Sequence, residues 1–139
     1  MMAMPPTRLF VYGTLDPTAA PPVIRPYVVR LNFVGDATVE GYLYDFNRYP
    51  GLVLDVAAPP VLGRVFDLPN DNGVTLAAFD RYEGAPTDHA SDAGLFLRVV
   101  CRPLLATGET TDAWVYVYNR PTARGRLLTS GRWLRTLPP

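Results

Sequence analysis

Proline and glycine interrupt this chain so often that it cannot be an assembly of long helices. The 139 residues include 15 Pro and 11 Gly, and neither residue is well tolerated inside a helix. The segments between them are short apolar runs, which predict strands bounded by turns. We expect strands over residues 8–12, 33–46, 52–57, 61–68, 95–104 and 113–118, with Gly63 as a candidate bulge.

One segment, residues 74–83, has the pattern of a helix. Asn72 is the expected N-cap, Gly84 the expected C′ residue, and Pro86 stops the helix. Between residues 18 and 31 we expect an irregular connection with at most two helical turns, because Pro26 interrupts it. Many strands and one good helix predict an α+β domain with a mixed, mostly antiparallel sheet.

The composition indicates one domain over residues 1–139, with loose ends near 1–7 and 134–139. Nearly half of the residues are hydrophobic, at 48%, enough to bury a core. The 13 basic residues, all Arg, balance 13 acidic ones, so neither nucleic acid nor a membrane surface is an expected partner. The absence of a signal-peptide pattern and the single cysteine, Cys101, predict a cytoplasmic protein with a buried core thiol.

Glu83 stands where a carboxylate is disfavoured. On a helix it shares a face with Leu76 and Phe79, which should point to the core. Burial and the negative end of the helix dipole both favour the neutral acid, so an upward pKa shift is expected. Such a group suits general acid/base chemistry. The alternative is a frayed helix end that lets Glu83 reach water.

Two further segments carry candidate binding residues. The first strand ends in Tyr12-Gly13-Thr14-Leu15, the YGTL turn, whose exposed N–H groups could bind an anion, although this is also an ordinary strand-to-turn sequence. Arg98 could bind a carboxylate through two nitrogen atoms or face solvent. Trp114, Tyr116 and Tyr118 share one strand face, where core packing is the default interpretation.

Metal chemistry is not expected from this sequence. His89 is the only histidine and Cys101 the only cysteine, so the common zinc sites are excluded. Asp88 and Asp92 beside His89 are interpreted as a solvated loop.

Taken in order, several segments resemble the gamma-glutamylcyclotransferase-like family. They are LFVYGTL at 9–15, EGYLYDFNRYPGLV at 40–53, VLGRVFDL at 61–68, FDRYEG at 79–84, FLRVVC at 96–101, AWVYVY at 113–118 and SGRW at 130–133. The resemblance implies a small β-barrel with flanking helices and an enzyme that needs no cofactor. It makes Glu83 the acid/base and the YGTL turn the cradle for a small gamma-glutamyl substrate, with Tyr116 as a further contact.

The implied reaction is intramolecular attack of the substrate α-amine on its γ-carbonyl, which releases 5-oxoproline and an amine. Three departures bear on substrate choice: Phe96 stands where relatives often have Tyr, Arg132 where they often have Asp, and the segment after the YGTL turn is short and proline-rich. Two alternatives stay open. One is a non-catalytic binding protein of the same fold; the other is an interaction protein that uses its Arg-rich C-terminal segment, interpreted as solvated. A monomer or small homo-oligomer fits either.

Overall fold

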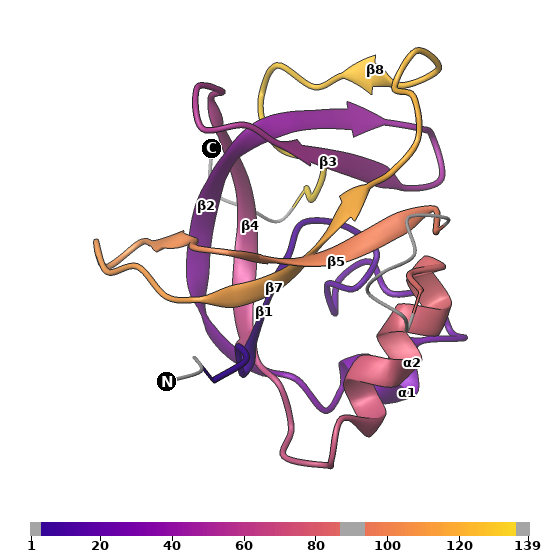
Figure 1. Ribbon diagram of the computed structural model, residues 1–139, viewed down its shortest axis with the longest axis vertical. Helices are drawn as coiled ribbons and strands as arrows, with labels where there is room; N and C mark the ends of the chain where they lie inside the picture. Colours follow the sequence, from indigo (N-terminus) through magenta and orange to yellow (C-terminus); the bar gives the residue numbers. More distant parts are fainter. Residues whose placement is uncertain (1–3, 87–93, 136–139) are drawn as a thin grey trace.

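The computed structural model describes residues 4–86 and 94–135, which form a strongly curled sheet with two helices on one side (Figure 1). The expected α+β architecture, mostly antiparallel and partly closed, is confirmed as a half-barrel. The elements in chain order are β1 (Arg8–Val11), α1 (Arg25–Val28), β2 (Asn32–Asp45), β3 (Pro50–Leu54), β4 (Pro60–Asp67), α2 (Val74–Glu83), β5 (Phe96–Cys101), β6 (Leu104–Leu105), β7 (Ala113–Tyr118) and β8 (Arg126–Leu127).

The sheet curls because its long strand, β2, takes part in several pairings. The main order is β3-β2-β4-β1-β7-β5, and β6 and β8 also pair with β2. Strand β5 lies at the edge of this order, and β6, which follows it after two residues, pairs with β2 at Ala37 and Thr38. The chain therefore returns from the edge strand β5 to the middle of the sheet. Among the strands of the described residues, β1 and β7 are the one parallel pair.

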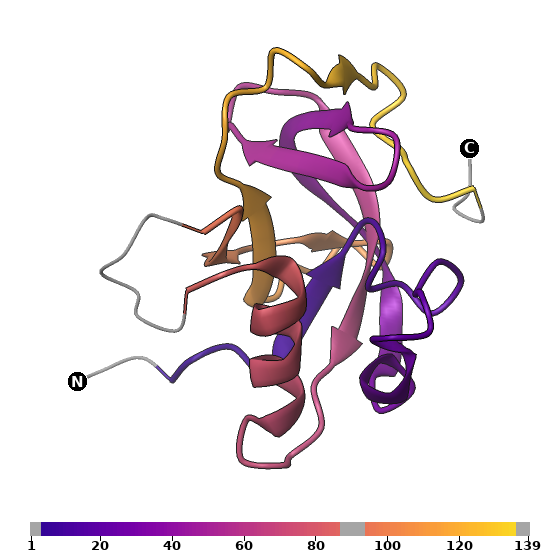
Figure 2. The same cartoon turned by 90° about the vertical axis from the view of Figure 1, so that its right-hand side faces the viewer.

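Strand β1 lies at the centre of the molecule and is buried on both faces. Leu9 and Val11 pack into the core cluster that also contains Phe79 of α2. Phe10 points the other way, into the core enclosed by the curled sheet. Figure 2 shows α2 standing in front of β1. A strand buried on both sides reads as a continuous apolar run, which is how its sequence reads.

Helix α2 has the predicted bounds, but its N-cap lies one residue later than expected. The N-cap is Gly73, with a φ of 79°, so the prediction of Asn72 as the cap is wrong. Asp71 does the capping instead, because its Oδ2 accepts hydrogen bonds from both the backbone N–H and the hydroxyl of Thr75. At the other end Gly84 is left-handed, with a φ of 67°, and the Ala85 N–H donates to the Asp80 carbonyl at 2.8 Å. This ending agrees with the predicted glycine stop.

Several connections differ from the expectations. The irregularity in the β2–β4 ladder lies between Phe33 and Gly35, not at Gly63, which pairs regularly with Ala37. Residues 18–31 contain a single helical turn, α1, as the proline predicted. The C-terminal segment is not a free solvated tail: β8 pairs with β2, and the Leu62 N–H donates to the Gly131 carbonyl at 2.7 Å. The Arg-rich sequence of this segment does not predict these tertiary contacts.

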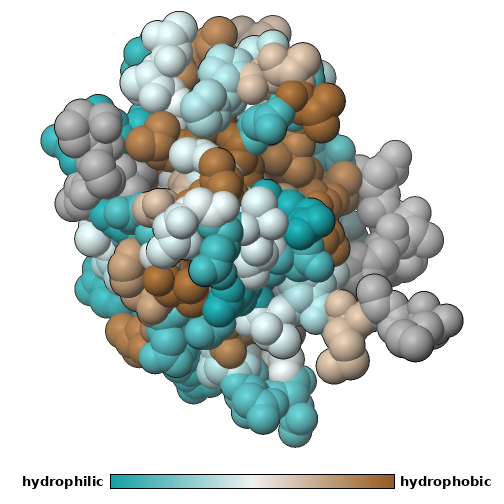
Figure 3. Space-filling model, turned by 90° about the vertical axis from the view of Figure 1, so that its left-hand side faces the viewer, coloured by the Kyte–Doolittle hydropathy of each residue, from teal (hydrophilic) through white to brown (hydrophobic). Residues whose placement is uncertain are grey.

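The surface is mixed in character. Figure 3 shows the face on the left of Figure 1, where apolar residues gather in the upper half and hydrophilic residues cover most of the lower half. Neither helix of the described chain has the length and apolar character needed to cross a bilayer.

Gly63 is required by the close approach of β1 to β4. A Cβ atom there would contact the Val11 carbonyl oxygen and lie 2.6 Å from the Phe10 ring. We therefore expect Gly63→Ala to lower the free energy of unfolding by about 1–3 kcal/mol, measured by urea denaturation. The matched control is Gly35→Ala, whose Cβ would meet Leu105 Cδ2 at an ordinary 3.6 Å and should change stability by less than about 0.5 kcal/mol. Equal stability of the two variants would contradict this account.

Candidate functional site

One cavity brings together the YGTL turn, Glu83 and Tyr116, residues far apart in the sequence. Its empty space is about 320 Å³, counting the part that opens to solvent. The lining residues are Phe10, Val11, Tyr12, Gly13, Thr14, Leu15, Tyr49, Pro50, Glu83, Phe96 and Tyr116. The sequence analysis proposed six of these and did not assign Tyr49 or Pro50, whose place in the wall depends on how the turn between β2 and β3 folds over β1.

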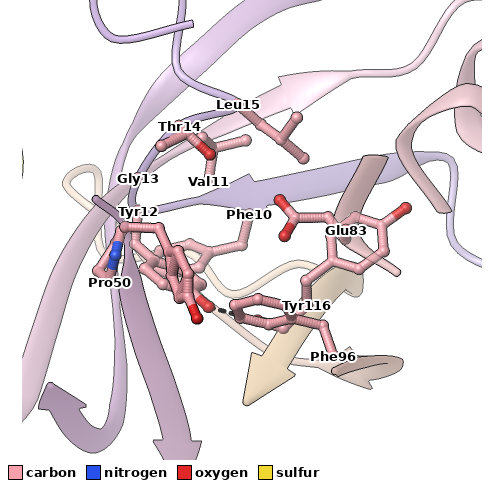
Figure 4. Close-up of a pocket in the computed structure, with 11 residues that line it drawn as sticks. Phe10, Val11, Tyr12, Gly13, Thr14, Leu15, Pro50, Glu83, Phe96 and Tyr116 are labelled. Carbon is pink, nitrogen blue, oxygen red and sulfur yellow. Dashed lines mark hydrogen bonds between the residues drawn. The ribbon is translucent and has the colours of Figure 1, made fainter. Parts of the chain in front are cut away.

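Glu83 is the one acidic residue among the described residues that line the cavity. Figure 4 shows its carboxylate pointing into the cavity, between Leu15 on one side and Tyr116 on the other. Desolvation among apolar neighbours raises the pKa of Glu83 from 4.5 to about 8. No ion pair within residues 4–86 and 94–135 involves Glu83. Its carboxyl group can therefore exchange a proton near neutral pH.

The YGTL turn is held by contacts on both sides. A Cβ on Gly13 would lie 2.5 Å from Pro50 Cγ, so glycine is needed for this packing and not for a left-handed backbone, because its φ is not positive. The hydroxyl groups of Thr14 and Tyr82 are hydrogen bonded, which ties the turn to α2. The hydrogen bonds between described residues do not use the N–H groups of Thr14 and Leu15, so these donors remain available to a ligand.

A fully buried carboxylate anchors the chain after the turn. Asp16 is inaccessible to solvent, and its Oδ2 accepts a hydrogen bond from Arg64 Nη1 at 2.8 Å. Its Oδ1 accepts two more from the N–H and hydroxyl of Thr18. The sequence analysis missed Asp16, although an Asp followed by Pro and Thr is a recognisable local capping pattern.

Asp80 is a second carboxylate that the sequence analysis did not assign. It is 4% exposed and accepts hydrogen bonds from Arg98 Nε at 2.8 Å, Arg98 Nη2 at 3.3 Å and the Tyr116 hydroxyl at 2.7 Å. Arg98 also stacks on the Trp114 ring, at 4.2 Å from its centroid. Arg98 thus binds a carboxylate through two nitrogen atoms, as one of its two interpretations had it, but the carboxylate is that of Asp80, and Arg98 is not among the described residues lining the cavity.

Two tyrosines that line the cavity, Tyr12 and Tyr116, stay protonated. Burial, followed by the charge of Glu83, raises the pKa of Tyr12 well above its usual value, and its hydroxyl donates to the Tyr116 carbonyl. Burial and the neighbouring Asp80 charge raise the pKa of Tyr116 as well. Both side chains are therefore hydrogen-bond donors, and neither is a base at neutral pH.

The other candidates of the sequence analysis lie outside this site. Cys101 is buried in the opposite core, and desolvation raises the pKa of its thiol to about 12. His89, Asp88 and Asp92 lie outside the described residues. Across the described ranges no group of three or more His, Cys, Asp and Glu side chains is arranged as metal ligands.

Comparison with known proteins agrees with this geometry. The sequence model of the family "Gamma-glutamyl cyclotransferase, AIG2-like" matches residues 9–135. The chain is 30% identical over 128 residues to the gamma-glutamylcyclotransferase family protein YtfP of Escherichia coli K12, covering 91% of this chain and 96% of YtfP.

Solved structures share the fold at lower sequence identity. The uropathogenic E. coli-specific protein c4763 superposes with a TM-score of 0.61 and 21% identity over 91% of both chains. An AIG2-like protein from Mus musculus superposes with a TM-score of 0.59 and 18% identity, over 80% of this chain and 76% of that chain. Because the family model and YtfP both match nearly the whole length, the chain belongs to the gamma-glutamyl cyclotransferase, AIG2-like family.

Proposed function

We propose that the protein is a gamma-glutamyl cyclotransferase-type enzyme that releases 5-oxoproline and an amine from a small gamma-glutamyl substrate. One observation carries the proposal: a carboxyl group with a pKa near 8, Glu83, faces the YGTL turn across a single cavity. Membership of the family supports the same general activity.

The chemistry needs little beyond positioning and one proton carrier. The substrate α-amine attacks its own γ-carbonyl, the ring C–N bond forms, and the γ-amide C–N bond breaks. Because the nucleophile is tethered, holding its reactive rotamer could supply up to about 7–11 kcal/mol of the barrier reduction. The α-nitrogen loses two protons between the ammonium and the lactam, and the leaving nitrogen gains two as it departs as an ammonium. Glu83 can carry these protons one after the other, so the net charge of the enzyme is unchanged after each turnover.

The backbone N–H groups of the YGTL turn can supply the partial positive charge that binds a negatively charged part of the substrate. Available N–H groups at Thr14 and Leu15 can bind the substrate α-carboxylate or the oxyanion that develops on the γ-carbonyl. Pro50 against Gly13 and the Thr14–Tyr82 hydrogen bond keep these donors in position. We assign Tyr116 a direct contact with substrate and Arg98 an indirect one, because Arg98 acts through the Asp80 carboxylate that also holds Tyr116.

Glu83→Gln should abolish turnover and leave the fold intact. Glutamine keeps the shape but cannot carry a proton, so 5-oxoproline release should fall by roughly 100-fold to 10,000-fold. Glu109→Gln is the matched control, because Glu109 is exposed in the turn between β6 and β7 and its loss should not change the rate. Release is assayed with a panel of gamma-glutamyl amines and dipeptides, on the samples used for melting temperature. An active but destabilised Glu83→Gln enzyme would remove Glu83 from the mechanism.

The raised pKa of Glu83 predicts how activity depends on pH. The free enzyme needs the ionised carboxylate to accept the ammonium proton, so kcat/KM should rise with pH and level off above about 8, the pKa of Glu83. A pH profile of 5-oxoproline release from pH 5.5 to 9.5 tests this. A rate that has already levelled off at pH 5.5 would show that Glu83 is solvated and keeps its ordinary pKa of 4.5, against this description of the site.

Stability should depend on pH in the opposite direction. Between the ordinary pKa of 4.5 and the folded value of about 8, the folded state binds one more proton at Glu83 than the unfolded state does. Its stabilising contribution is therefore complete below pH 4.5 and declines as the pH rises to 8, by a few kcal/mol at most, to order of magnitude. Glu83→Gln should lack this decline, so the variant should gain stability relative to the wild type between pH 5 and pH 9, measured by urea denaturation. A constant difference would refute the shift.

A further inference from the structure

Four aromatic rings form a continuous wall along one side of the cavity. Tyr49 and Phe96 line it directly and meet edge to face, with centroids 5.8 Å apart. Phe46 and Tyr118 stand beside them: Phe46 stacks on Tyr118 at 4.3 Å and lies 5.8 Å from Tyr49, and Tyr118 meets Phe96 at 5.6 Å. We call Phe46, Tyr49, Phe96 and Tyr118 the aromatic wall.

The backbone fits closely around these rings. A Cβ on Gly51 would lie 2.7 Å from Phe46 Cε2, and a Cβ on Gly125 would lie 2.7 Å from Phe46 Cε1. Phe96 and Tyr118 are direct partners in the β5–β7 ladder, where facing aromatic residues stabilise each other. A hydrogen bond joins the side chains of Tyr49 and Tyr118. The wall is therefore a preorganised surface that draws on β5, β7 and the turn between β2 and β3.

The aromatic wall lies where the leaving group of the proposed reaction should be. Figure 4 shows Phe96 across the cavity from Thr14 and Leu15, with the Glu83 carboxylate between them. If the YGTL turn holds the gamma-glutamyl carboxylate and Glu83 faces the scissile amide, the amine side of the substrate extends toward Tyr49 and Phe96. Phe96 also lacks the hydroxyl of a tyrosine, which makes this side of the cavity more apolar.

The charges among the lining residues favour an uncharged leaving amine; the charge of Arg120 acts on Tyr118, which is not itself a lining residue. Among the described lining residues there is no Arg, and the nearby Arg98 is engaged by Asp80. A carboxylate on the leaving group would thus meet Glu83 without a counter-charge from these residues, whereas a flat apolar group would gain ring contacts. We propose that the aromatic wall is a leaving-group subsite that selects gamma-glutamyl amides of aromatic amines; this rests on the proposed function.

The test compares three substrates that differ only in the leaving group. They are the gamma-glutamyl amides of benzylamine, which offers a ring, and methylamine, which offers none, and gamma-glutamylglycine, which carries a carboxylate. The kcat/KM for 5-oxoproline release should be higher for the benzylamide than for the methylamide by about tenfold or more, and the glycine compound should be the poorest.

Variants of the wall should change this ratio selectively. Tyr49→Ala removes a lining ring and should lower the benzylamide-to-methylamide ratio by about threefold to tenfold, while Tyr49→Phe, which keeps the ring, should retain most of it. Phe33→Ala is the control, because Phe33 is a 59% exposed ring on β2 that packs on Phe66 and does not line the cavity. Its ratio should equal that of the wild type.

The outcomes separate the two proposals. Turnover of all three compounds with equal kcat/KM, or a preference for the glycine compound, would overturn the subsite and leave the reaction standing. The same ratio in wild type and Tyr49→Ala would also overturn the subsite. No 5-oxoproline from any of the three would refute the reaction and, with it, the subsite that depends on it.

Discussion

The last turn of α2 keeps its place because a buried carboxylate finds three donors there. Asp80 accepts bonds from Arg98 of β5 and Tyr116 of β7, two residues that face each other in the β5–β7 ladder. Removing one partner of such a buried pair typically costs about 3–5 kcal/mol. The contacts of Asp80 with Arg98 and Tyr116 therefore hold the end of α2 against the sheet. They also fix the direction of the Glu83 side chain, which follows about one turn later.

Asp80 and Glu83 are the same functional group in two different environments. Asp80 is surrounded by donors, while Glu83 is desolvated by apolar neighbours and has no ionic partner within the described residues. Environment alone separates a structural carboxylate from one that can exchange a proton near neutral pH. This division of labour explains how a small domain, with no histidine among the described residues that line its cavity, could perform acid/base chemistry.

Local patterns in the sequence predicted most of the elements and the central part of the candidate site. Apolar runs located the strands, and the position of Glu83 on its helix predicted a raised pKa from burial. Two kinds of feature could not be predicted. The pairing of Arg98 with Asp80 depends on residues 18 positions apart that meet only after the sheet folds. The docking of the Arg-rich C-terminal segment depends on backbone pairing with β2 and on the ion pair between Arg126 and Asp45, which lie 81 positions apart.

Strand β1 combines burial on both faces with a direct continuation into the YGTL turn. Amides in such a strand exchange their hydrogens only through near-global opening, whereas the N–H groups of Thr14 and Leu15, for which no described residue is an acceptor, can exchange through local fluctuations. The boundary between these two regimes falls within one or two residues of Tyr12. A ligand that orders the turn would thus slow hydrogen exchange in the turn without affecting exchange in β1. Ligand occupancy could therefore be measured from the exchange rates of a few turn amides, with the β1 amides as an internal reference.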